Sequence, residues 1–119
     1  MKIQESAENY LEAILVISKR KGYVKSIDIA NELGVSKPSV SVAMKSFKAE
    51  EYITVSEAGD ITLTPKGLKI AKKVYERHNV IASALIRLGV SEETAYADSC
   101  KIEHVISDES FKKLKEFIS

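Results

Sequence analysis

The sequence has little cysteine, proline and glycine, and it lacks tryptophan. Among 119 residues there are one cysteine, two prolines and five glycines. A single cysteine excludes an internal disulfide, and this usage is typical of proteins in a reducing cytoplasm. So few prolines and glycines also argue against a flexible linker or a low-complexity tract. We therefore expect a cytoplasmic chain without a signal peptide that folds around a hydrophobic core.

Long hydrophobic runs and an excess of one charge are also missing. The longest apolar run, residues 79–90, is interrupted by polar residues well short of a membrane span. Lysine and arginine total 18 and aspartate and glutamate 17, which gives a net charge of +1. The chain is therefore no globally basic nucleic-acid binder, and any such function depends on where the charges lie.

What the sequence does contain is helical periodicity with capping residues at regular intervals. The pattern predicts, in order, three helices, a hairpin, a long helix and two further helices. Serine or threonine residues mark the starts of the helices after the first. These predicted caps are Ser26, Ser36, Thr64, Ser91 and Ser107.

Residues 26–63 follow the pattern of a winged helix-turn-helix. Gly34 supplies the left-handed residue of the turn, and Pro38 lies in the first turn of the second helix, where its missing N–H costs nothing. Two short β-branched runs around residues 57–60 predict the hairpin that forms the wing. Such proteins insert the second helix into the major groove of DNA. We therefore predict a mainly α fold with a DNA-binding domain over residues 1–64.

The predicted second helix carries a local positive patch, with three lysines and no acidic residue from Ser36 to Lys48. Lysines and hydroxyls mostly contact phosphates, which supply affinity more than sequence choice. No Arg, Asn or Gln lies there for bidentate base contacts, so we expect shape readout to exceed direct readout. The alternative is a solvated face of a protein-interaction module. The predicted DNA-contacting residues are Ser36, Lys37, Ser39, Ser41, Lys45 and Lys48.

A second cluster lies near the C-terminus, where Cys100, Glu103 and His104 have i, i+3, i+4 spacing. On a helix these positions share one face. Thiolate, carboxylate and imidazole are all ligands of divalent transition metals, although three donors do not complete a coordination shell. Further candidates are His78 in the long helix and Glu12, with Asn9 one turn before it, in the first helix. Taken singly, each residue also has a structural reading, such as a small buried cysteine or a hydrogen-bonded core histidine.

Four segments together resemble the iron- and manganese-dependent repressors of the diphtheria toxin repressor family. They are SAENYLEAIL, IANELGVSKPSVSVAMKSF, LTPKGLKIAKKVYERHNVI and CKIEHVISDE. The resemblance implies a cytoplasmic homodimer that binds operator DNA when loaded with Fe²⁺ or Mn²⁺ and represses metal-uptake genes. It also implies a helical dimerisation and metal-binding domain over residues 65–119, without the SH3-like third domain of longer members.

The resemblance implies a ligand set by position. His78, Cys100, Glu103 and His104 match ligands of the family, and Glu12 matches a ligand of its manganese branch. Asn9 departs from the family, which has Met or Asp there, and Cys100 matches the iron branch where the manganese branch has Glu. Ala82 and Tyr96 replace further ligands of the iron branch, which argues against an iron-type second site and leaves a manganese-type paired site open.

The donor types leave the choice of metal between two ions. A thiolate favours Fe²⁺, Co²⁺, Ni²⁺ and Zn²⁺ over Mn²⁺, whereas carboxylates favour Mn²⁺. We expect Fe²⁺ or Mn²⁺ as the cofactor, with Zn²⁺, Co²⁺ or Ni²⁺ binding in vitro.

Three other functions stay open at this point. One is a winged-helix regulator that senses redox state through Cys100 without a metal. Another is an enzyme with Cys100 as nucleophile and a histidine as base, but no oxyanion-hole loop is visible. The third is a purely structural helical dimerisation module, which leaves the charge pattern from Ser36 to Lys48 unexplained. We expect no enzyme activity, no small-molecule substrate and no membrane partner.

Overall fold

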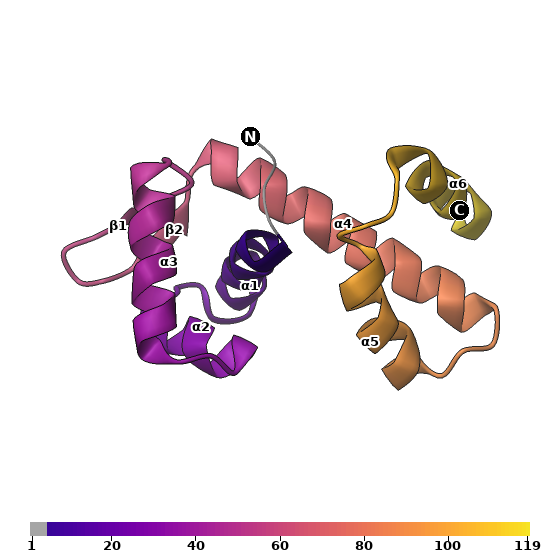
Figure 1. Cartoon of the computed structure of the whole chain (residues 1–119), viewed down its shortest axis with the longest axis horizontal. Coiled ribbons are helices and arrows are strands. Elements are labelled where there is room, and N and C mark those ends of the chain that lie inside the picture. Colours follow the sequence, from indigo (N-terminus) through magenta and orange to yellow (C-terminus); the bar gives the residue numbers. More distant parts are fainter. Residues whose placement is uncertain (1–4) are drawn as a thin grey trace. The chain divides into compact units, whose positions relative to one another are not determined.

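The computed structural model describes residues 5–119, which fold into two compact units, one ending at Lys72 and the other spanning Lys73–Ser119. Figure 1 shows the mainly α architecture that the sequence predicts. None of the helices in the described part of the chain is long and apolar enough to cross a membrane. The elements are α1 (Glu5–Lys21), α2 (Ser26–Leu33), α3 (Lys37–Ala49), β1 (Ile53–Val55), β2 (Ile61–Leu63), α4 (Pro65–Arg87), α5 (Glu92–Ile102) and α6 (Asp108–Ile118).

The first unit is the predicted winged helix-turn-helix. Helix α2 packs against both α1 and α3, and β1 and β2 pack against α3 and α1 respectively (Figure 1). Its core is apolar, because each helix turns one hydrophobic stripe inward. The residues that are almost fully buried there are Leu11, Ile14, Ile17, Val24, Ile29, Val40 and Ile53.

The turn between α2 and α3 orients the second helix. Gly34 has φ +66°, a left-handed conformation that glycine adopts without a steric penalty. The Val35 N–H donates to the Ala30 carbonyl at 3.1 Å, which closes the end of α2. The wing is an antiparallel pair with Thr54 opposite Thr62, and residues 56–60 form the loop that joins the two strands.

The predicted helix caps are confirmed at four of five positions. The side chains of Ser36, Thr64, Ser91 and Ser107 each accept a backbone N–H three residues later. Ser26 is wrong, because α2 already includes it and Lys25 is the N-cap. The physical reason is Asp28, whose carboxylate reaches back to the Lys25 N–H at 2.9 Å and satisfies the helix start from within.

The second unit consists of the C-terminal part of α4 with α5 and α6. Its apolar core is small, with Val74, Ile81, Ala84 and Ala95 buried. Polar residues share the interior with them, namely Arg77, Ser99 and Glu103. A buried charge is costly unless it is paired or binds a metal, so these residues direct attention to the site described next.

Candidate metal centre and DNA-binding surface

Glu103 is a fully buried carboxylate at the C-terminal end of α5, with a side-chain exposure of 0%. Its Oε2 lies 2.9 Å from His78 Nδ1 on α4, and its Oε1 lies 3.3 Å from His104 Nε2. The contact with His104 does not have the geometry of a hydrogen bond, so Oε1 has no hydrogen-bond partner within the described residues. A buried carboxylate with an unsatisfied oxygen between two imidazoles fits the environment of a cation ligand.

The His78 ring contacts two of the other predicted ligands, the buried Glu103 and the exposed Cys100. Besides Glu103, its Nδ1 lies 3.0 Å from Ser99 Oγ and 3.7 Å from Cys100 Sγ. The Tyr96 ring covers the imidazole, with 5.5 Å between the ring centroids. The second unit therefore gathers one thiol, one carboxylate and two imidazoles, a donor set that suits a divalent transition metal.

From the spacing we expected Cys100, Glu103 and His104 to lie on one face of a single helix. The structure differs, because only Cys100 lies within α5. Helix α5 ends at Ile102, Glu103 is its C-cap, and His104 lies in the turn that follows. The pattern still brings the side chains together, because Glu103 keeps helical dihedrals of φ −58° and ψ −25°. The Val105 N–H and the Ile106 N–H both donate to the Ile102 carbonyl at 3.0 Å, which tightens this turn.

Glu12 and Asn9 lie on α1 in the first unit, where both are half-buried. Their assignment as metal ligands comes from the family resemblance and stays a prediction.

Two residues that the sequence reasoning missed contact this cluster. Ser99 is fully buried, donates to the Tyr96 carbonyl at 3.0 Å and lies beside the His78 ring. Its position four residues before Glu103 was a usable signal, because i and i+4 share a helix face. Arg77 is also buried and contacts the turn after α5. No sequence signal distinguishes it from the other basic residues of α4.

The predicted DNA-contacting residues all lie exposed at or on α3. The lysine side chains are open to solvent, as phosphate contacts require. Two hydroxyls have a structural use as well, because Ser36 Oγ caps α3 and lies 2.8 Å from Ser39 Oγ. Val42 was missed, although it is 70% exposed in the middle of the same helix. Val42 has helical spacing with Ser39 and Lys45, two of the predicted contacts, which was a usable signal of its place on the same face.

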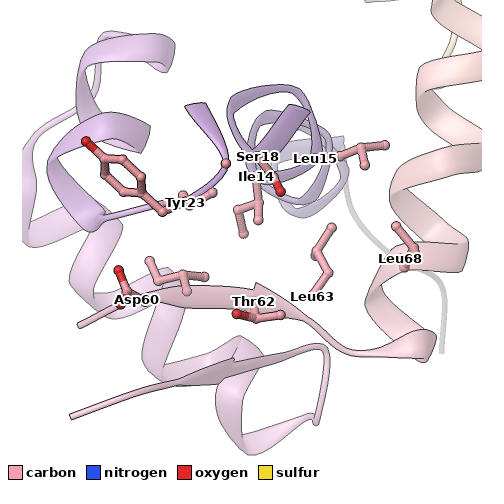
Figure 2. Close-up of a pocket in the computed structure, with 11 residues that line it drawn as sticks. Ile14, Leu15, Ser18, Tyr23, Asp60, Thr62, Leu63 and Leu68 are labelled. Atoms are coloured by element: carbon pink, nitrogen blue, oxygen red, sulfur yellow. The ribbon is translucent and has the colours of Figure 1, made fainter. Parts of the chain in front are cut away.

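A separate pocket of about 450 Å³ lies in the first unit between α1, β2 and the start of α4. Figure 2 shows its apolar lining, with Ile14 and Leu15 on α1, Leu63 on β2 and Leu68 on α4. The polar groups at its edge belong to Ser18, Asp60 and Thr62. It contains none of the predicted metal or DNA ligands.

Comparison with known families decides the class. The N-terminal DNA binding domain of the iron dependent repressors matches residues 2–60, and their metal binding and dimerisation domain matches residues 64–119. The chain belongs to the iron-dependent repressor family. The resemblance seen in the sequence is thereby confirmed, and with it a metal-dependent DNA-binding transcriptional repressor rather than an enzyme.

Individual relatives agree with this assignment of the repressor. It is 34% identical over 113 residues to the HTH-type transcriptional regulator MntR of Geobacillus kaustophilus (strain HTA426), which covers 95% of this chain and 80% of that protein. The crystal structure of T. acidophilum IdeR matches with a TM-score of 0.85 and 26% identity, over 98% of this chain and 55% of that one. The structure of the manganese regulator SloR matches with a TM-score of 0.81 and 27% identity, over 99% of this chain and 54% of that one. The repressor thus spans about half the length of these two solved chains.

Proposed function

We propose that the repressor binds operator DNA through α3 when its second unit holds a divalent cation. The observation that carries this proposal is the buried Glu103 carboxylate between His78 and His104, with Cys100 beside them. We propose these four residues as metal ligands, together with Glu12 and Asn9 from the predicted set. A bound cation supplies the positive charge that offsets the burial of an ionised carboxylate.

The proposed physiological metal is Fe²⁺ or Mn²⁺. The family is described as iron dependent, whereas the related SloR is a manganese regulator. In this chain the Cys100 thiol favours the softer ion and the Glu103 carboxylate the harder one. Zn²⁺, Co²⁺ and Ni²⁺ are expected to bind in vitro, since affinity alone does not select the metal.

On the DNA side, the proposed contacts place α3 in the major groove. Lys37, Lys45 and Lys48 would pair with phosphates, and the hydroxyls of Ser39 and Ser41 would add neutral hydrogen bonds. The repressor is proposed to act in the cytoplasm, and its proposed targets are operators of metal-uptake genes. A dimer would present two such helices roughly 34 Å apart, one turn of the double helix.

A homodimer is proposed to form through the second unit. Three of its large apolar side chains are strongly exposed, namely Leu88 at 69%, Val105 at 80% and Phe117 at 51%. Helix α6 is amphipathic and has no buried residue in the single chain. These exposed side chains are the proposed contacts of the dimer, because the matching family model is described as a metal binding and dimerisation domain. Analytical ultracentrifugation checks the state, and a purely monomeric species at micromolar concentration would contradict the proposal.

The functional test is an anaerobic DNA-binding titration. Duplexes are first selected from a random library with the Mn²⁺-loaded repressor, because the operator is not known. Binding to a selected duplex is then measured by fluorescence anisotropy with Mn²⁺, with Fe²⁺ and with a chelator. We expect a metal-dependent gain of about 100-fold, equivalent to about 2.7 kcal/mol. Equal binding in chelator would contradict metal control.

A further inference from the structure

Arg77 is a buried guanidinium on α4 that contacts several parts of the second unit. Its Nη1 donates to the Ile106 carbonyl at 2.9 Å and to the Glu103 carbonyl at 3.4 Å. Its Nη2 pairs with the Asp108 carboxylate, and its guanidinium carbon lies 5.4 Å from the centre of the Phe111 ring. One side chain of α4 therefore contacts both the end of α5 and the start of α6.

The groups that Arg77 holds enclose the turn that carries two proposed ligands. The carbonyl of Glu103 lies at the end of α5, where helical carbonyls lack intrahelical partners. Asp108 is the first residue of α6. Between them lie His104 and the strongly exposed Val105, whose side chain contributes little burial to hold the turn. The planar guanidinium can bond both ends at once, which a single ammonium group cannot do with the same geometry.

We propose that Arg77 is a positioning residue of the metal centre. Its guanidinium fixes the turn 103–107 so that Glu103 and His104 stay directed toward their partners, and it ties the same turn to α6. The role depends on the proposed function, because Glu103 and His104 are taken as metal ligands. Groups that orient metal ligands in this way typically contribute 10–100-fold to metal affinity.

The chain offers a matched control in Arg87, further along α4. Its Nη1 donates to the Phe117 carbonyl at 3.1 Å, and its guanidinium carbon lies 5.4 Å from the Phe117 ring centre. Arg87 thus attaches α6 to α4 by one polar contact and one ring contact, as Arg77 does, but through the Phe117 carbonyl instead of the Asp108 carboxylate and away from the turn 103–107. Any effect of Arg77 that arises only from attaching α6 to α4 should therefore appear at Arg87 as well.

The experiment compares R77K, R87K and the wild type in an anaerobic Co²⁺ titration of the full chain. Co²⁺ is used because its ligand-field and thiolate-to-metal absorption bands report the geometry of the donors. We expect R77K to weaken Co²⁺ binding about tenfold and to change the ligand-field spectrum. R87K should bind Co²⁺ within about twofold of the wild type and with an unchanged spectrum, because Arg87 contacts Phe117 and not the turn 103–107. A tenfold change in affinity corresponds to about 1.4 kcal/mol, so the two variants are easily distinguished.

Two further variants separate the possible failures. R77K is first checked for folding by circular dichroism, and D108N replaces it in the test if it does not fold. D108N removes the carboxylate partner of Arg77 at an exposed position and should weaken Co²⁺ binding several-fold. Wild-type affinity and spectrum in R77K or D108N would overturn the role of Arg77, and so would equal losses in R77K and R87K. E103A tests the ligand itself, and unchanged Co²⁺ binding there would contradict the proposed function instead.

Discussion

The two units of the repressor use polar residues in opposite ways. In the first unit the core is apolar, and the proposed DNA-contacting lysines of α3 lie exposed. In the second unit Arg77, Ser99 and Glu103 are buried. A long polyanion is attracted by exposed charges, whereas a buried carboxylate such as Glu103 needs a cation or other partner to offset its lost hydration, although the proposed ligand Cys100 is itself exposed. We therefore expect an exchange of one residue to have a smaller effect in the exposed patch than in the buried cluster.

The largest expected effect is the loss of metal affinity on substitution of the buried Glu103 in the second unit. E103A removes the central carboxylate and should weaken Mn²⁺ binding by at least about 100-fold, more than loss of an orienting group would. The metal-free variant should still fold, as circular dichroism can check, but with a lower melting temperature because His78 and His104 lose a buried partner. Equilibrium dialysis measures the affinity, and the exposed acid Glu109 on α6 provides the control E109A. Similar affinities in both variants would remove Glu103 from the ligand set.

The core of the first unit gives the next largest effect. In G67A the new Cβ would overlap the backbone carbonyl of Tyr52, which cannot move as a flexible side chain does. Alanine gains about 1 kcal/mol of helix propensity over glycine, but the overlap should dominate and lower the free energy of unfolding by about 2 kcal/mol. Urea denaturation checks this, with K69A on the exposed side of α4 as control. Greater stability in G67A would show that the contact relaxes freely.

A moderate effect is expected on the DNA-contacting surface. K45A should weaken binding to every duplex and reduce the slope of log affinity against log salt by about 0.9, the contribution of one phosphate contact. The exposed Lys112 on α6 serves as the control, since K112A should leave the slope unchanged. Anisotropy titrations between 50 and 200 mM salt, the range over which such contacts show, distinguish the two. An unchanged slope in K45A argues against a phosphate contact at that position.

The exposed Val42 on α3 gives a smaller expected effect, which concerns sequence preference and not overall DNA affinity. An apolar side chain on a recognition helix can contact the C5-methyl group of thymine. V42A should therefore reduce the preference for one selected base pair without changing the salt slope. Binding to selected duplexes with each single T-to-C exchange measures this preference. If V42A keeps the whole preference profile, Val42 makes no base contact.

The smallest effect concerns a surface ion pair. The Lys21 ammonium lies 2.6 Å from the Asp28 carboxylate, and this hydrogen bond, followed by that of the Lys25 N–H, holds the pKa of Asp28 below its ordinary value. The pair therefore stabilises the fold above pH ~4, the ordinary aspartate value, and loses this stabilisation as the pH falls further. D28N should lower the melting temperature slightly at pH 7 and not at pH 3. Equal deficits at both values would show that charge is not the cause.

The sequence alone predicts the first unit well, because its elements are local. Gly34, Pro38 and the serine caps each signal their own turn or helix start, and the fold follows from their order. The one cap that failed, Ser26, was displaced by Asp28 from inside the helix, which spacing does not reveal.

The second unit was less predictable. The spacing of Cys100, Glu103 and His104 indicated a cluster, but the end of α5 at Ile102 and the contact with Ser99 depend on tertiary packing. Arg77 could not have been predicted, since burial of one arginine among several basic residues is decided only by the folded neighbours.

Reciprocal coupling between metal and DNA tests the central claim most directly. Mn²⁺ affinity is measured for the full chain alone, with a saturating selected duplex and with an unselected duplex of equal length. If the two units are linked, thermodynamics requires DNA to tighten metal binding by the factor by which metal tightens DNA binding, about 100-fold. The account predicts this gain with the selected duplex and a smaller one with the unselected duplex. Identical Mn²⁺ affinities in all three samples would contradict it.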